Sequence, residues 1–220
     1  MQTYNTPTAI TAVLDVPAGH LRFIAAERTD TLVEVRPVDA SKARDVKAAE
    51  RTTIEFADGV LRVETPEKNA AFGPTGTVEV TVQLPAGSRI QATGSAELRG
   101  AGRLGEVSVQ NAYGPIKLDE ATTAQLGALD GDITIGRLTG PAEVSTARGD
   151  VRVGEALQGT LALSTQLGNV SVGVPAGVTA SLNAGTPYGR ISNALANTGG
   201  APVVEIHATT ASGDIDAHTV

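Results

Sequence analysis

The stretch GDITIGRLTGPAEVSTARGDVRV, residues 131–153, contains the same short pattern twice. Each copy begins with Gly-Asp, at Gly131 and at Gly149, and continues with an apolar, a polar and an apolar residue. Such alternation is typical of a β-strand with one buried face, and a glycine before it is typical of a turn. The stretch therefore predicts two successive units, each with a strand that starts directly after a glycine turn.

The pattern recurs along the second half of the chain. Six glycines share this context and are separated by 17, 18, 19, 21 and 24 residues: Gly114, Gly131, Gly149, Gly168, Gly189 and Gly213. Residues at seven and five positions before each glycine, and at two after it, are apolar. One such unit cannot bury its own apolar face, so the units have to stack. The repeat predicts an all-β fold, a single-stranded β-helix or β-solenoid, with rungs of about 17–21 residues.

The first ninety residues depart from this repeat. They read as longer alternating strands, with the segment SKARDVKAAER, residues 41–51, between them. This segment predicts a short helix with Ser41 as its N-cap. We expect residues 1–90 to form a strand-rich cap that contains this helix and is continuous with a solenoid of residues 91–220. The segment EKNAAFGPTG, residues 67–76, predicts a mobile loop.

The last repeat differs from the others in what it places inside. Ala208 and Ala217 stand where most repeats have a larger apolar residue, and Asp214, Asp216 and His218 add polar groups. A polar last rung protects an open sheet edge against pairing with other chains. We therefore expect this repeat to form the terminal rung of the solenoid.

A polar residue follows each glycine at the third position and is predicted to point outward. On the flat face of a solenoid these side chains would form one column. They are the candidate partner-facing residues: Lys117, Thr134, Arg152, Ser171 and Ser192. Tyr113 and Tyr188 precede two of the glycines, four rungs apart in chain order, and either stack on a sugar ring or pack on a neighbouring corner.

The composition excludes several classes of partner. The chain has a formal net charge of −7 and only 3% aromatic residues, which disfavours nucleic acid, because phosphates require cations and bases require stacking side chains. The chain has no cysteine, which excludes disulfides and zinc-thiolate sites. We expect no cofactor.

The N-terminal sequence MQTYNTPTAITAVLDV has neither a basic segment nor a continuous apolar segment of the kind found in signal peptides. The chain contains no run of about 18 apolar residues, so we expect no membrane insertion. These patterns predict a cytoplasmic protein, or an extracellular one if a leader has been removed.

Two segments carry a family resemblance. The run LPAGSRIQATGSAELRGAGRLGEVSVQNAYGPIKL, residues 84–118, and the pattern VPAGHLRF, residues 16–23, resemble the bacterial "putative adhesin" β-strand-repeat family. This family of unknown function is common in actinobacteria. The resemblance implies a β-helix-like fold over most of the chain, and the word adhesin there rests on analogy between folds.

Arg148, Gly149 and Asp150 spell the tripeptide that cell-adhesion receptors bind. In the repeat, however, Gly-Asp recurs as a turn element, and the arginine fills a variable position before the glycine. Asp and Asn favour such turns because their side chains bond local backbone N–H groups. The sequence therefore predicts a solenoid corner. A calcium site built from Asp132, Asp150 and Asn169 on adjacent rungs is an alternative.

Candidates for catalysis are few. His20, His207 and His218 lack metal-ligand spacing, and Ser145 and Ser164 lack the context of an activated nucleophile. We therefore predict a non-enzymatic β-solenoid interaction scaffold, whose partner is a protein or a second copy, or alternatively a glycan. An intracellular self-associating structural protein is the second alternative, and a polysaccharide-active enzyme of the β-helix type is disfavoured.

Overall fold

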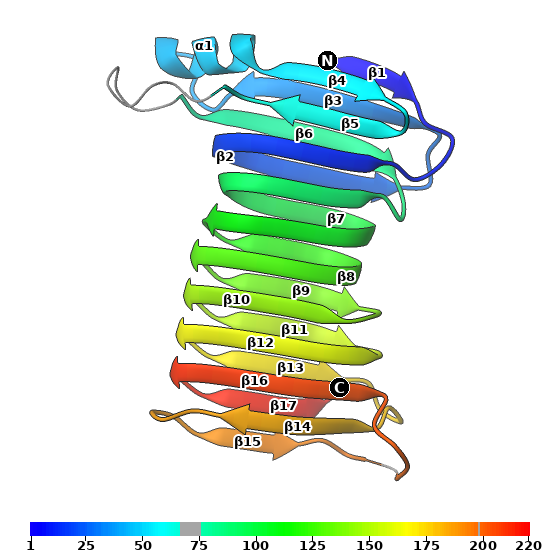
Figure 1. Ribbon diagram of the computed structural model, residues 1–220, viewed down its shortest axis with the longest axis vertical. Helices are drawn as coiled ribbons and strands as arrows, with labels where there is room; N and C mark the ends of the chain where they lie inside the picture. The colour runs from blue at the N-terminus through cyan, green and yellow to red at the C-terminus, as the bar shows by residue number, and fades with distance from the viewer. Residues whose placement is uncertain (67–75, 198) are drawn as a thin grey trace.

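The computed structural model describes residues 1–66, 76–197 and 199–220. Within these ranges it contains seventeen β-strands and one α-helix, which confirms the predicted all-β solenoid. Figure 1 shows the strands stacked in a column, with the N-terminus and α1 (Ala43–Arg51) at one end and β14 and β15 at the other. The predicted loop at residues 67–76 lies outside the described residues except for Gly76.

The strands form one sheet that coils around the long axis of the molecule. In chain order they are β1 (Gln2–Asn5), β2 (Thr11–Ala26), β3 (Asp30–Pro37), β4 (Thr53–Ala57), β5 (Val60–Glu64), β6 (Val78–Pro85), β7 (Arg89–Tyr113), β8 (Ile116–Asp130), β9 (Ile133–Leu138), β10 (Ala142–Arg148), β11 (Val151–Ala156), β12 (Gly159–Leu167), β13 (Val170–Val174), β14 (Ala180–Gly185), β15 (Ile191–Ala194), β16 (Val204–Ser212) and β17 (Ile215–Thr219).

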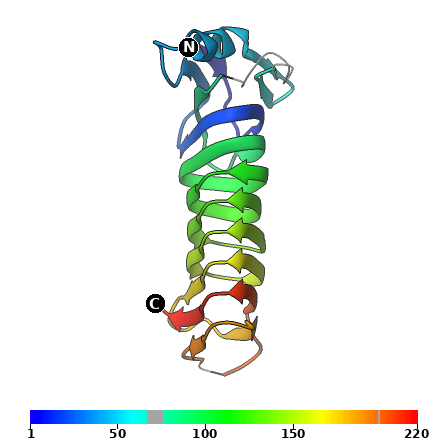
Figure 2. The ribbon, with the colours of Figure 1, turned by 90° about the vertical axis from the view of Figure 1, so that its left-hand side faces the viewer.

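Each rung of the solenoid has two sides that meet at one of the six repeat glycines, which we call corner glycines. The strands before these glycines form the first face, which includes β10, β12, β14 and β16. The strands after them form the second face, which includes β9, β11, β13, β15 and β17. Figure 2 shows the two faces as the opposite sides of a flattened coil. We name each rung by its corner glycine, so β10 and β11 form the Gly149 rung.

Neighbouring rungs pair in parallel, and their inward side chains form ladders. On the second face Val151 pairs with Ile133 on one side and with Val170 on the other. All three side chains are buried, as the alternation of the sequence predicts. Burying a side chain of this size contributes roughly 1.5–3 kcal/mol, so the ladders supply the main stabilisation of a fold with few aromatic residues.

The corners require glycine because adjacent rungs approach closely there. Gly149 has a φ of 133°, and a Cβ added to it would lie 2.3 Å from the carbonyl oxygen of Gly131. A side chain would clash with the backbone of the neighbouring rung and would strain its own backbone. The periodic glycine is therefore the residue that permits close stacking of the corners.

The parallel stacking extends into the first ninety residues. Strand β2 pairs in parallel with β7 on one side and with β5 and β6 on the other. Strands β1, β3 and β4 pair antiparallel, and α1 packs against β3 and β6. The division of the chain at residue 90 stays a prediction, because the strands on its two sides belong to one continuous sheet.

The predicted helix start was wrong in its N-cap. The N-cap is Lys42, which makes no side-chain capping bond. Ser41 instead donates its N–H and its hydroxyl to Asp39 Oδ1, at 3.0 and 2.6 Å. The hydroxyl bond from Ser41, followed by the Lys42 ammonium, lowers the pKa of Asp39 to about 2. Because Asp39 forms this turn, Ser41 is not available to the helix.

The predicted order of the last rungs was also wrong. Strand β16 pairs with β12 on one side and with β14 on the other, and β17 lies in the same way between β13 and β15. The C-terminal Gly213 rung is therefore inserted between the Gly168 and Gly189 rungs, as Figure 1 shows for the red strands. Ala208 and Ala217 are fully buried in this position. The terminal rung is the Gly189 rung.

Candidate functional site

The candidate partner-facing residues lie in one outward column on the second face. Register pairs join Lys117 to Thr134, Thr134 to Arg152, and Arg152 to Ser171. The predicted neighbour of Ser171 was Ser192, but the inserted rung places Asp216 between them. The column continues past Lys117 to Arg99 and Arg22 on β7 and β2. We call these eight residues the outward column.

Three cations are adjacent at one end of this column. Arg22, Arg99 and Lys117 are exposed and stand opposite one another on three neighbouring strands. Arg99 donates to Glu97 at 2.7 Å, whereas Arg22 and Lys117 have no anionic partner in the part of the chain that is described. Like charges directly opposite on neighbouring strands repel. The arrangement is therefore poised to accept an anionic group.

Glu97 links this end of the column to a histidine. Its carboxylate, which binds Arg99, also lies 3.2 Å from His20 Nδ1. Five side chains line a groove of about 370 Å³ here: Glu97, Arg99, His20, Arg22 and Glu79. The hydrogen bond from Arg99, and then the charges of Arg99 and His20, lower the pKa of Glu97 despite its partial burial. Glu97 therefore stays ionised, and it holds Arg99 against the sheet.

One flank of the outward column is a ladder of corner Asp and Asn residues. Asp132 Oδ1 accepts the N–H of Asp150, and Asp150 Oδ1 accepts the N–H of Asn169, each at 2.8 Å. In the same way Asn169 Oδ1 accepts the N–H of Asp214, and Asp214 Oδ1 accepts the N–H of Arg190, each at 2.8 Å. Each side chain therefore satisfies a backbone donor of the next rung. The sequence predicted that these side chains would bond N–H groups of their own turn, and this partner was wrong, because stacking brings the N–H of the neighbouring corner within reach.

This ladder decides how the Arg148-Gly149-Asp150 tripeptide is presented. Asp150 gives one carboxylate oxygen to Asn169 and the other to Arg152, at 2.8 and 2.5 Å. Its side chain is only 21% exposed. A receptor that requires a free, protruding aspartate would have to break both bonds. The tripeptide is thus a corner of the solenoid, with its carboxylate in use.

The same geometry bears on the calcium alternative. Asp132, Asp150 and Asn169 each direct Oδ1 at the backbone of the following rung, so these oxygens do not converge on one point. Among the described residues, no group of three or more His, Cys, Asp and Glu side chains could hold a metal ion.

Tyr113 and Tyr188 are placed at the same corner position on different rungs. They are 60% and 77% exposed. Because the Gly213 rung is inserted between the Gly168 and Gly189 rungs, five rung steps separate them, where the sequence predicted four. At about 4.8 Å per step, they lie roughly 24 Å apart and cannot stack on one sugar ring together.

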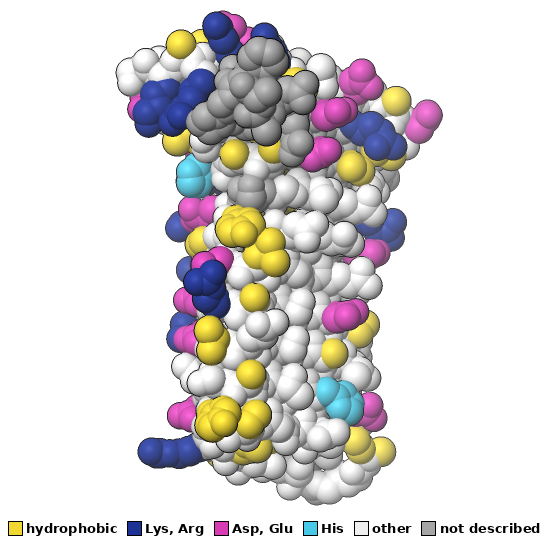
Figure 3. Space-filling view, turned by 60° about the vertical axis from the view of Figure 1, so that its left-hand side comes forward, with side chains coloured by type: hydrophobic (Ala, Val, Ile, Leu, Met, Phe, Trp, Pro, Cys, Tyr) yellow, Lys and Arg dark blue, Asp and Glu magenta, His cyan; other side chains and the backbone are white. Residues whose placement is uncertain are grey.

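The other flank of the outward column has three glycines in succession, of which Gly173 is buried beside the Val220 side chain. Gly136, Gly154 and Gly173 follow one another there, and a Cβ added to any of them would lie 2.0 to 2.6 Å from a carbonyl oxygen of the neighbouring rung. Figure 3 shows charged side chains along both edges of the column and few over the middle of the visible face.

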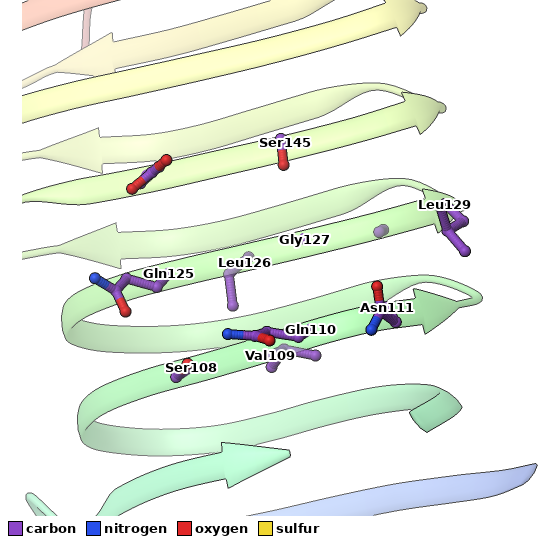
Figure 4. Close-up of a pocket in the computed structure, with 11 residues that line it drawn as sticks. Ser108, Val109, Gln110, Asn111, Gln125, Leu126, Gly127, Leu129 and Ser145 are labelled. Atoms are coloured by element: carbon purple, nitrogen blue, oxygen red, sulfur yellow. The ribbon is translucent and has the colours of Figure 1, made fainter. Parts of the chain in front are cut away.

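The first face carries a groove that the sequence did not predict. It has a volume of about 430 Å³ and crosses β7, β8 and β10, with Gln110, Asn111, Gln125 and Ser145 among its lining residues (Figure 4). Its floor is Gly127, where an added Cβ would lie 3.8 Å from its nearest neighbour. The backbone would accept a side chain at this position, so the hollow exists because Gly127 has none.

Four threonines form a second ladder that the sequence analysis missed. Thr146, Thr165, Thr210 and Thr186 each stand three residues before a corner glycine. Each donates its hydroxyl to the carbonyl of the corner glycine in the preceding rung, at 3.2, 2.9, 2.9 and 3.1 Å. The signal was in the sequence as a repeated Thr-x-x-Gly. Thr146, Thr165 and Thr210 are buried and Thr186 is partly buried, and their hydroxyls connect each corner to the next.

Fold, repeat and corner ladders define a β-solenoid protein. The chain belongs to the Toastrack DUF4097 family, whose model matches residues 14–220, and this confirms the predicted resemblance. No curated protein matches the chain. No helix in the described ranges is long and apolar enough to cross a membrane.

Several solved structures are similar over nearly the whole chain. One is "a putative cell adhesion protein" from Clostridium sporogenes, with 11% identity, 100% of this chain and 98% of that chain covered, and a TM-score of 0.39. Another is "a putative adhesin" from Bacteroides fragilis, with 12% identity, coverage of 98% and 95%, and a TM-score of 0.46. A third, "putative adhesin" from Parabacteroides distasonis, has 13% identity, coverage of 98% and 95%, and a TM-score of 0.38.

Proposed function

We propose that the protein is a non-enzymatic scaffold that binds an acidic, extended segment of a partner protein along the outward column. The observation that carries this proposal is the run of Arg22, Arg99 and Lys117 on three neighbouring strands, with two of the three cations unpaired in the described chain. A partner carboxylate at this position would relieve the repulsion between them.

The surroundings of the column support an extended partner. Gly136 and Gly154 are exposed and leave a flat path beside it. The hydroxyls of Thr134 and Ser171 lie further along the same column and offer hydrogen bonds. Asp132 and Asp150 direct their Oδ1 atoms at backbone N–H groups of the next rung, and Asp216 lies toward the end of the column opposite the three cations.

The test uses a fluorescent poly-glutamate peptide as the probe. Its affinity is measured by fluorescence anisotropy for the wild type, for Lys117→Glu and for the control Arg62→Glu, an exposed charge reversal on β5 outside the column. Lys117→Glu should weaken binding about tenfold, or about 1.4 kcal/mol. Equal loss in both variants, or no loss in Lys117→Glu, contradicts the proposal.

A neutral glycan in the groove of the first face is the second candidate. The hollow at Gly127, which the backbone does not require, favours it. Gly127→Gln should fill the groove and abolish retention on insoluble cell-wall glycan, whereas Ala162→Gln, exposed on the same face outside the groove, should not. Retention that survives Gly127→Gln excludes this candidate.

The compartment of this scaffold is tested separately. The cytoplasmic prediction requires that the protein in intact cells survives added protease and is recovered with the cytosol. Loss of the protein on protease treatment would place it on the cell surface, where a cell-wall glycan becomes the partner to examine first.

A further inference from the structure

The Gly189 rung leaves the hydrophobic core open at one end of the solenoid. In the inner rungs the inward side chains are buried, as for Ile206 and Ile215 of the Gly213 rung, each 1% exposed. In the Gly189 rung Ile191 is 48% exposed, and Leu182 and Ala184 are only partly buried. In the part of the chain that is described, the apolar ladder therefore reaches the end of the molecule with its last side chains partly exposed.

The backbone at this end is also unpaired on one side. Among the described residues, β14 pairs with β16 and β15 with β17, and neither strand has a second partner. Thr179 accepts a bond from the β16 side, and the Asn197 side chain bonds both N–H and C=O of Ala180 from the open side. The backbone N–H and C=O groups of successive residues in a strand point alternately to its two edges. Leu182 and Ala184 therefore direct their N–H and C=O groups to the open edge, as Ala180 does.

The edge lacks the charges that usually protect such strands. Between residues 180 and 203 the single charged residue is Arg190, in a chain with a net charge of −7. Charged side chains on edge strands prevent pairing with other chains. In Figure 3 the tip opposite the helix is largely free of charged side chains. This end could meet an identical end without carboxylates repelling one another.

The opposite end of the molecule cannot serve as the partner surface. There the outermost strands, β1 and β4, are short and pair antiparallel, and α1 packs across β3 and β6. A head-to-tail stack of copies would have to remove this helix. Two copies can instead meet through their identical Gly189 rungs, around a two-fold axis that closes the assembly.

We propose that two copies of this chain associate end to end, with β14 of one copy paired antiparallel to β14 of the other. The register that uses every free group pairs Leu182 with Ala184 of the second copy, and Ala184 with Leu182. Asn183 then faces the second copy's Asn183 across the axis, as a non-hydrogen-bonded pair with Cα atoms about 4.5 Å apart. The open ends of the two cores cover each other.

The chain suits a cross-linking test because it has no cysteine. Asn183→Cys places one thiol per copy on the proposed axis. Ala162→Cys is the matched control, because it is exposed in the same outward position of the first face, two rungs inside the molecule. Oxidation should join two copies of Asn183→Cys by a disulfide, and Ala162→Cys should show no disulfide-linked dimer under denaturing, non-reducing conditions. Equal cross-linking of the two variants overturns the proposal.

Mass measurement by light scattering over a range of concentrations supplies a second test without a new covalent bond. The wild type should rise from 22.3 kDa toward twice that mass. Ile191→Lys should stay monomeric, whereas Leu129→Lys, at a side chain that is 44% exposed in mid-solenoid, should still dimerise. A wild type that stays monomeric at every concentration, or a dimer unaffected by Ile191→Lys, overturns the proposal. Near-native thermal unfolding of the variants shows that they fold.

Discussion

Individual side chains at the corners hold one rung to the next. Thr165 donates its hydroxyl to Gly149, and Asp150 accepts the N–H of Asn169, so a hydroxyl and a carboxylate bond across the same pair of rungs. A hydrogen bond of this kind contributes about 0.5–1.5 kcal/mol net, and leaving its buried partner unsatisfied costs about 1–3 kcal/mol. The two ladders therefore fix the stacking distance and the register at the corners.

Thr210→Val tests the threonine ladder. The buried Thr210 hydroxyl donates to the carbonyl of Gly168 at 2.9 Å, and valine keeps the shape without the donor. The free energy of unfolding in urea should fall by about 1–2 kcal/mol. The neighbouring Thr209 is exposed, and Thr209→Val should change the free energy of unfolding by less than about 0.5 kcal/mol. Equal effects of the two substitutions would contradict the assignment.

Glu97→Gln tests the carboxylate that holds Arg99. The Arg99 hydrogen bond lowers the pKa of Glu97 below its ordinary value of 4.5. The ionised form is thus favoured in the folded state, so its stabilising effect is present above pH 4.5 and is lost as the pH falls through the folded-state pKa. The substitution should lower Tm at pH 7 by about 1–3 °C and should leave it unchanged near pH 2. A decrement independent of pH contradicts this role.

At the scale of the elements, alternation and glycine spacing were sufficient to predict the strands. Val151 and Val153 are buried and Arg152 is exposed, as the pattern after Gly149 indicates. The helix at residues 41–51 was predicted within two residues of its start, but its N-cap was not, because Asp39 competes for Ser41. The groove at Gly127 could not be predicted, since a glycine that leaves a hollow looks like one that makes a turn.

Gly149 and Gly127 distinguish a glycine that the backbone requires from one that a larger residue could replace. Gly149→Ala places a Cβ against the Gly131 carbonyl at a φ of 133° and should cost more than about 2 kcal/mol. Gly127→Ala meets no atom within 3.4 Å and should be neutral or stabilising by up to about 1 kcal/mol, because alanine restricts the unfolded chain. Thermal unfolding measures both, and effects of the same sign and size would contradict this account of the corners.

At the scale of the whole molecule, the order of the rungs departs from the order of the chain. The physical reason is visible at two positions of the Gly189 rung. Arg190 stands where the Gly131, Gly149, Gly168 and Gly213 rungs have Asp or Asn, so it has no side-chain oxygen for the N–H of a following rung. Asn193 stands at an inward position that is apolar in the other repeats, and it remains exposed. Both residues are tolerated at the end of the stack and would be unfavourable inside it.

Arg190 and Asn193 are visible in the sequence, but the predicted order of the last two rungs was wrong. The small size of Ala208 and Ala217 does not indicate a terminal rung. Ala208 is buried between Leu163 and Ala184, and Ala217 between Val172 and Asn193. A polar residue at an inward position is a stronger sign of a terminal rung than a small apolar one. An amide buried without hydrogen-bond partners is unfavourable, whereas a small apolar side chain can be buried without an unpaired polar group.

The inserted rung is the central claim, because it creates the open end through which two copies are proposed to associate. Paired cysteines in the otherwise cysteine-free chain measure it directly. Position 162 pairs with position 207, which in turn pairs with position 183. The account predicts that Ala162→Cys with His207→Cys forms a disulfide within one chain on oxidation. It also predicts that Ala162→Cys with Asn183→Cys does not, since about 9.6 Å separates rungs two steps apart. The reverse result would place the rungs in chain order and would contradict the account.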